Sequence, residues 1–235
     1  MDYRGGLKAM YNNPDWLVQT SLIGLCFLIP VVGSIAVMGY AFEAAAYLHK
    51  TNREGYPDFS FGRLGPYLSR GVGPFVVGLV FMLVFVPLFI VENMISFAVN
   101  ALVVPLDIPF LALGLSLGMW AIFGVMNAIL NIFQLALMIR GGLSGEFAES
   151  FRFPFCTEFF KRAGMDALYA QMYLGLVYAC LVFFAIVPFW LLFLTTLPAI
   201  GVFFLSYAWI ICQLYRSYLT EKGTPFPVKC DVIDQ

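Results

Sequence analysis

The sequence predicts an all-α fold, a polytopic bundle of transmembrane helices that forms a single integral membrane domain over residues 1–235. Composition is the first observation behind this prediction, because 61% of the residues are hydrophobic and 11% are charged. Soluble domains average roughly 45–50% apolar and about 25% charged residues. The second observation is that long stretches carry no charge: residues 16–42, 71–91, 108–139 and 167–215. Since about 20 apolar residues suffice for a helix to cross a bilayer, several crossings are expected.

Two Pro-Gly patterns decide how many crossings we expect. Residues 29–33 read IPVVG and residues 197–201 read LPAIG. Proline interrupts a helix interior and glycine permits turns, so each pattern predicts a tight turn between two crossings. The alternative for the first pattern is one kinked helix over residues 16–50, which leaves five crossings. With both turns the sequence predicts six transmembrane segments, at residues 14–30, 31–50, 71–91, 108–140, 165–188 and 198–220.

The positions of lysine and arginine predict the orientation. In the six-segment layout the N-terminal tail, the loops 51–70 and 141–164 and the C-terminal tail share one side and hold essentially every basic residue. The positive-inside rule makes that side cytoplasmic. We therefore expect a multi-pass protein of the cell membrane, the inner membrane, with both termini in the cytoplasm. In the five-segment layout the charges of Arg4 and Lys8 move to the other side, which fits the rule less well.

An internal repeat accompanies this layout. The aromatic and basic pattern of residues 59–70 returns at residues 151–162. We expect repeat units at approximately 1–50, 59–140 and 151–227, each with an interfacial amphipathic helix followed by a helical hairpin. The rare residue types that match at a second, longer offset are Pro30, Gly33, Tyr47, Gly55 and Pro57 with Pro198, Gly201, Tyr215, Gly223 and Pro225.

Two cytoplasmic loops mix aromatic and basic side chains. This composition is typical of helices that lie in the headgroup layer, with aromatic rings among the lipids and basic groups toward anionic headgroups. A docking surface for a cytoplasmic partner is the alternative. The lipid-facing or partner-facing residues are Phe59, Phe61, Arg63, Arg70, Phe151, Arg152, Phe153, Lys161 and Arg162.

A polar stripe inside the fourth expected segment is the first candidate site. Asn127, Asn131 and Gln134 are spaced by four and three residues, which places them on one face of a helix. Amides in hydrocarbon need partners because an unpaired polar group there is costly. The stripe could line a solute path. The alternative is hydrogen bonding between helices, worth about 0.6–2 kcal/mol for each contact.

Glu43 is the second candidate, because it is the one carboxylate within an otherwise apolar expected segment. Ionisable residues inside a membrane are candidates for function, and here the role would be gating or ion coupling. The alternative is a structural salt bridge with Arg53, Arg63 or Arg70, or an exposed position near the headgroups.

The remaining residues offer little for catalysis. His49 is the only histidine, and the five cysteines contain no C-x-x-C pair, so we expect neither a metal site nor a cofactor. No nucleophile with a base and no phosphate-binding loop is recognisable, so we expect no enzyme. A formal net charge of -1 disfavours nucleic acid as a partner.

Several turn and aromatic residues resemble the first half of the membrane family catalogued as domain of unknown function 4013. The resemblance covers residues 14–80, and residues 140–227 more loosely. It implies a prokaryotic multi-pass membrane protein without an assigned activity, so no catalytic residue is carried over. The residues that carry it are Trp16, the 29–33 turn, Gly39, Tyr40, Gly55, Tyr56, Pro57, Asp58, Phe59, Arg70 and Gly71.

Two functions of different classes follow from these observations. The first is a non-catalytic scaffold or accessory component of a membrane assembly, which packs membrane lipids, other membrane protein subunits or copies of itself. The second is a small-solute channel or transporter with the Asn127 stripe as its midplane site. The scarcity of deeply placed ionisable residues favours the first function, since coupled carriers use such residues.

Overall fold

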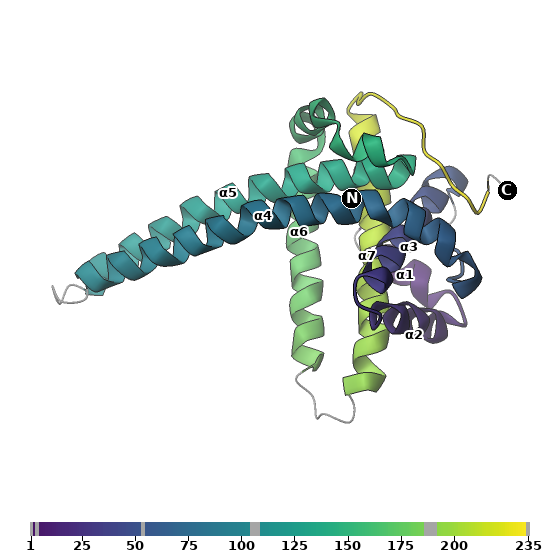
Figure 1. Ribbon diagram of the computed structural model, residues 1–235, viewed down its shortest axis with the longest axis horizontal. Helices are drawn as coiled ribbons and strands as arrows, with labels where there is room; N and C mark the ends of the chain where they lie inside the picture. Colours follow the sequence, from purple (N-terminus) through teal and green to yellow (C-terminus); the bar gives the residue numbers. More distant parts are fainter. Residues whose placement is uncertain (1, 3–4, 53–54, 104–108, 186–191, 234–235) are drawn as a thin grey trace.

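The computed structural model describes residues 2, 5–52, 55–103, 109–185 and 192–233, and Figure 1 shows that these residues form helices and their connections. No strand occurs among them, so the expected all-α fold is confirmed for the described part of the chain. The helices are α1 (Gly5–Tyr11), α2 (Trp16–Phe27), α3 (Val32–Thr51), α4 (Leu64–Val103), α5 (Pro109–Ser144), α6 (Phe153–Ala185) and α7 (Leu192–Thr220), with single 3-10 turns η1 (Phe61–Arg63) and η3 (Phe147–Phe151).

Three described helices are long and apolar enough to cross a membrane. The spans are Phe61–Leu102, Leu113–Ser144 and Thr195–Thr220. A helix lies at each of the six expected segments, but α2 has only 12 residues, fewer than the 17 to 25 of an ordinary crossing. Six crossings therefore stay a prediction. The structure indicates a helical protein with helices that are able to span a membrane.

The first Pro-Gly pattern is a turn, as expected. Helix α2 ends at Phe27 and α3 begins at Val32, so one continuous helix over residues 16–50 is not observed. The backbone of Val31 has a φ of 63°, which a β-branched residue rarely adopts. A Cβ atom on Gly33 would lie 1.9 Å from the carbonyl oxygen of Cys26, so only glycine fits where the chain reverses.

The second Pro-Gly pattern is not a turn, and the expectation that it separates two segments was wrong. Pro198 lies inside α7. A proline within a membrane helix loses one backbone hydrogen bond, and neighbouring helices can compensate for it. Here the neighbour is α2, because an added Cβ on Gly201 would lie 2.2 Å from the carbonyl oxygen of Thr20, and one on Gly24 equally close to that of Leu197. The two glycines permit a close helix crossing beside the proline.

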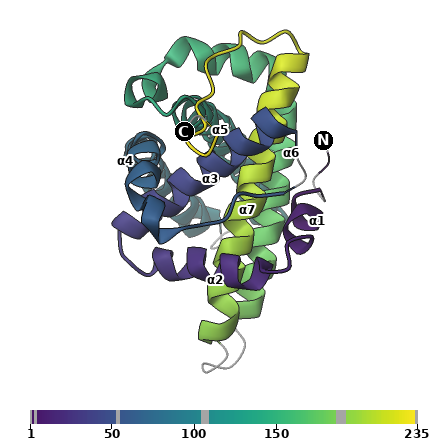
Figure 2. The ribbon, with the colours of Figure 1, turned by 90° about the vertical axis from the view of Figure 1, so that its right-hand side faces the viewer.

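Helix α3 is the centre of the packed part of the molecule, and Figure 2 shows it between α7 and the α4–α5 pair. Its alanine-rich stretch favours a helix, and its small side chains let neighbours approach. A Cβ on Gly39 of α3 would lie 1.8 Å from the carbonyl oxygen of Tyr67, and one on Gly71 of α4 would lie 2.0 Å from that of Ile35. Helices α3 and α4 therefore cross in backbone contact.

Two helical hairpins leave this core in different directions. Helices α4 and α5 run side by side and project as a long arm, whereas α6 and α7 extend from the core another way (Figure 1). With 40 residues, α4 is about 60 Å long at 1.5 Å per residue, twice a hydrocarbon core of about 30 Å. The divergence of the hairpins leaves the outer part of the arm without cover from the rest of the described chain.

Candidate functional site

Glu43 forms a buried ion pair with Arg70. Glu43 on α3 is 1% exposed and Arg70 on α4 is 4% exposed, and their Oε2 and Nη1 atoms are 2.6 Å apart. The backbone contact at Gly39 and Gly71 brings the two helices close enough for this pair. Among the three arginines considered as partners, Arg70 is the one that meets Glu43; Arg63 instead lies over the ring of Tyr67, and Arg53 lies outside the described residues.

The C-terminal tail, defined as residues 223–233 after α7, contacts both members of this ion pair. The backbone N–H of Val232 donates to Glu43 Oε1 at 2.9 Å, and the Cys230 thiol is 3.6 Å from the same oxygen. Arg70 Nη2 donates to the carbonyl oxygen of Lys229 at 2.9 Å. Both charges thus have additional hydrogen-bond partners, which a buried pair needs to offset its desolvation.

Cys230 is fully buried beside this carboxylate. Burial, and then the negative charge of Glu43, raise the pKa of its thiol to about 11. The thiol therefore stays protonated at neutral pH and remains able to donate to Glu43. The role of the tail is not predicted from the sequence, although Phe226, Val228, Cys230 and Val232 alternate with other residues in the two-residue period of an extended, half-buried segment.

Further contacts attach the tail to the ends of α5 and α7. The backbone N–H of Lys229 donates to the carbonyl oxygen of Leu143 at 3.0 Å, and its ammonium group is 2.9 Å from Glu146. The hydroxyl of Tyr215 on α7 donates to the carbonyl oxygen of Phe226. The tail therefore joins α3, α4, α5 and α7, and the Glu43 site ties together segments far apart in the sequence.

Arg140 is a second buried cation that the sequence analysis did not single out. It is 8% exposed at the end of α5, its Nε lies 2.5 Å from Glu149 Oε2, and its guanidinium lies over the rings of Phe155 and Phe226. Burial acts to raise the pKa of Glu149, but the hydrogen bond and charge of Arg140, with Arg152, outweigh it and the pKa is lowered.

The expected lipid-facing residues divide between the surface and the core. Phe61, Phe153, Arg152, Lys161 and Arg162 are exposed, and Arg63 and Phe151 are half-buried. Phe59 and Arg70 are buried and do not face lipid. The reason is that Phe59 packs against Tyr40 and Tyr67, with ring centroids 5.2 and 5.6 Å away, while Arg70 turns inward to Glu43.

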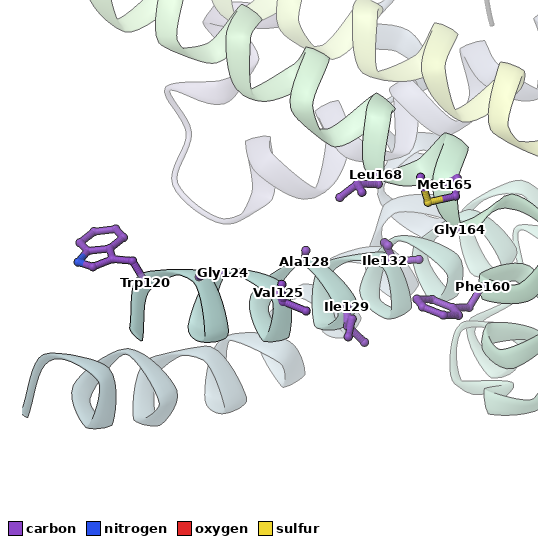
Figure 3. Close-up of a pocket in the computed structure, with 11 residues that line it drawn as sticks. Trp120, Gly124, Val125, Ala128, Ile129, Ile132, Phe160, Gly164, Met165 and Leu168 are labelled. Atoms are coloured by element: carbon purple, nitrogen blue, oxygen red, sulfur yellow. The ribbon is translucent and has the colours of Figure 1, made fainter. Parts of the chain in front are cut away.

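An apolar groove opens between α5 and α6 where the two hairpins diverge, and Figure 3 shows side chains of both helices along it. Its volume is about 520 Å³. Near one end the rings of Phe133 and Phe160 stack with centroids 5.7 Å apart. None of the described residues that line it is charged; they are Trp120, Ala121, Gly124, Val125, Ala128, Ile129, Ile132, Phe160, Gly164, Met165 and Leu168.

The polar stripe of α5 borders a different cavity, of about 300 Å³, between α3, α5, α6 and α7. Asn131 and Gln134 line it, whereas Asn127 is not among the residues that line it. The amide of Asn131 donates to the backbone carbonyl oxygen of Asn127 within α5 at 2.8 Å. Gln171 of α6 adds a third amide. Gln171 lies in a predominantly apolar segment, and a single amide in such a segment is the sequence signal that indicates a candidate site residue.

Three described helices long and apolar enough to cross a membrane indicate a helical membrane protein. A buried ion pair joins its core, which borders an apolar groove and a smaller cavity lined by amides. The chain belongs to the family described as "Protein of unknown function (DUF4013)", whose model matches residues 22–196. The match includes the Pro30 turn and the Glu43–Arg70 pair, and it ends before the tail. A search of curated proteins found no match, and a search of solved structures found none.

Proposed function

We propose that this protein is a non-catalytic, multi-pass membrane scaffold or accessory component whose α4–α5 arm packs against lipids and other membrane protein subunits. The observation that carries the proposal is that α4, where it forms the arm, exposes apolar side chains on several successive faces. The successive residues Met82, Leu83 and Val84 are 58%, 76% and 47% exposed, and successive helical residues point about 100° apart. A helix that is hydrophobic all round requires cover from lipid or from a partner.

The α5 side of the arm also suits a partner helix. Added Cβ atoms on Gly114 and Gly118 would meet no atom within 4 Å, so this G-x-x-x-G face is open. Small residues in membrane helices permit close approach of another helix. Phe110, Leu113 and Leu117 are exposed nearby and would contribute apolar area to such a contact.

The finer topology belongs to the same proposal. Six segments cross the cell membrane, and both termini are cytoplasmic. Support comes from the gathering of Arg70, Arg140 and Lys229 at the end where α4 begins, α5 ends and the tail binds. The repeat units at residues 59–140 and 151–227 draw support from the aromatic 3-10 turns η1 and η3, each of which lies directly before a long helix.

A small-solute channel or transporter is the alternative function. The amide-lined cavity favours it, but most of the side chains that line this cavity are apolar and Asn127 is not among them. Glu43, the residue suited to ion coupling, is held by Arg70 and the tail. The scaffold therefore has the stronger support.

Extraction of the full chain in native nanodiscs, followed by mass spectrometry, tests the scaffold proposal. We expect other membrane proteins or tightly held lipids in fixed stoichiometry. Leu83→Ala together with Phe97→Ala removes two of the most exposed side chains of the arm and is expected to lower the retained amount several-fold. Tyr178→Ala, at a comparably exposed position on α6, is the matched control and should retain it. A clean monomer or symmetric homo-oligomer with neither protein nor lipid would contradict the proposal.

A further inference from the structure

The amide-lined cavity contains polar groups that the fold leaves unpaired. Its walls come from Met38 of α3, Asn131 and Gln134 of α5, Gln171 of α6 and Tyr207 of α7. Within the described residues, the side chains of Gln134, Gln171 and Tyr207 make no hydrogen bond. All three side chains are half-buried, and within a hydrocarbon layer lipid chains offer such groups no hydrogen-bond partner. A ligand with matching polar groups would supply one.

The remaining walls limit the chemistry of that partner. Among the described residues that line the cavity, none carries a carboxylate, an ammonium or a guanidinium group, so an ionic ligand would lose its hydration without a counter-charge. Most of the lining is apolar or aromatic, which suits a hydrophobic body. Ligand pockets typically combine such walls with a few polar groups that orient the ligand. The apolar and aromatic residues are Met38, Leu135, Met138, Leu174, Phe203 and Phe204.

We propose that this cavity binds a neutral amphiphile, a molecule with an apolar body and one or two carbonyl or hydroxyl oxygens. The amide N–H groups of Gln134 and Gln171 donate to those oxygens, and the amide oxygens or the Tyr207 hydroxyl accept from a ligand hydroxyl. The rings of Phe203 and Phe204, with centroids 5.6 Å apart and nearly perpendicular, pack against the apolar body. This site lies between α3, α5, α6 and α7, apart from the exposed side chains of the arm that carry the scaffold proposal, and it goes beyond the scaffold function.

Equilibrium dialysis of the full chain in nanodiscs, with empty nanodiscs as background, tests this proposal with two probes. Menadione presents two ring carbonyls, and 1-decanol presents one hydroxyl on an alkyl chain. We expect saturable binding of at least one probe at one molecule per chain. Gln134→Leu and Gln171→Leu, which keep the side-chain size, are each expected to raise its Kd at least tenfold. Asn127→Leu is the control on the same helix and should leave the Kd within twofold.

The probe that saturates identifies the ligand group, since menadione indicates a carbonyl and 1-decanol a hydroxyl. Tyr207→Phe removes only a hydroxyl and keeps the packing, so it tests the site even where a glutamine variant does not fold. It should weaken 1-decanol binding if that probe saturates. The proposal is overturned if neither probe saturates, if both glutamine variants bind like the unaltered chain, or if Asn127→Leu weakens binding as much as they do.

Discussion

At the scale of single residues, the Glu43–Arg70 pair shows why one carboxylate persists in an apolar helix. The pair is buried and closed by the tail, whereas the pair between Lys229 and Glu146 has both side chains about half exposed. Removal of one partner from a buried pair leaves an uncompensated charge, and this costs far more than the loss of a solvated pair. The two pairs therefore make a matched comparison within one region of the molecule.

Arg70→Met is expected to lower the free energy of unfolding by about 3–5 kcal/mol, because Glu43 remains buried without its counter-charge. Lys229→Met should lower it by about 1 kcal/mol or less, and it keeps the backbone contacts of the tail. Both values can be measured by denaturant titration of the full chain in mixed micelles. Equal losses in the two variants would show that the Glu43 pair does not stabilise the core.

At the scale of elements, two helix crossings depend on glycine, because only glycine lets the backbones approach so closely. Gly39 and Gly71 permit the α3–α4 crossing, and Gly24 and Gly201 permit the α2–α7 crossing, since a Cβ at any of them would overlap the facing backbone. Gly114 lies on the open arm and would accept a Cβ without contact. Glycine thus has a packing role in the core that it does not have within the described arm.

Gly39→Ala is therefore expected to destabilise the protein by about 1–3 kcal/mol, the usual range for overpacking. Gly114→Ala is the control, and it should be neutral or stabilising by up to about 1 kcal/mol because alanine is the better helix former. Thermal unfolding in nanodiscs, followed by circular dichroism, measures both. A Gly39→Ala chain that melts like the unaltered protein would mean that α3 and α4 do not cross in backbone contact.

At the scale of the whole molecule, ionised carboxylates connect the end of α5, the start of α6 and the tail. Glu149 binds Arg140 and Arg152. Glu158 accepts hydrogen bonds from the backbone and hydroxyl of Thr224 and pairs with Arg162. Burial acts to raise the pKa of Glu158, but these hydrogen bonds and the charge of Arg162 outweigh it, so its pKa is lowered, as is that of Glu149.

Acid is expected to weaken the fold for this reason. A carboxylate with a lowered pKa contributes stability above its unfolded pKa, about 4.3 for glutamate, and this contribution is lost as the pH falls through the folded pKa. The melting temperature should therefore vary little between pH 7 and 5 and decline below about pH 4.3. Glu149→Gln should lower the melting temperature at pH 7 and reduce the decline in acid. A decline as steep as that of the unaltered chain would exclude Glu149 as its source.

Sequence patterns over a few neighbouring residues predicted the features that depend on those residues alone. Uncharged stretches indicated the helices, and the 29–33 pattern indicated a turn. For Glu43 the sequence left open gating or ion coupling, an exposed position, and a salt bridge with one of three arginines, and the structure shows a salt bridge with Arg70. Pro198 was misinterpreted because its place inside α7 depends on the crossing with α2, which local sequence does not record. The sequence alone could not assign Gln171 to the same cavity as Asn131 and Gln134, because that requires knowing how α6 packs against α5.

The tail was missed for a further reason. It contacts Glu43 across 189 positions of the sequence, and no helical period extends into it. Its alternating apolar residues indicate burial but not the partner, and the partner is a site that two other helices build.

The position of the tail also affects how the protein is made. Residues 223–233 leave the ribosome after every helix of the described chain. They nevertheless supply hydrogen bonds to Glu43, which is synthesised before the other buried charged residues that the structure describes, Arg70 and Arg140. Glu43 and Arg70 are both synthesised before the tail groups of Lys229 and Val232 that bond to them. Completion of the core therefore waits until the tail has been synthesised, and a chain truncated before Cys230 would present cellular quality control with an incompletely bonded buried ion pair.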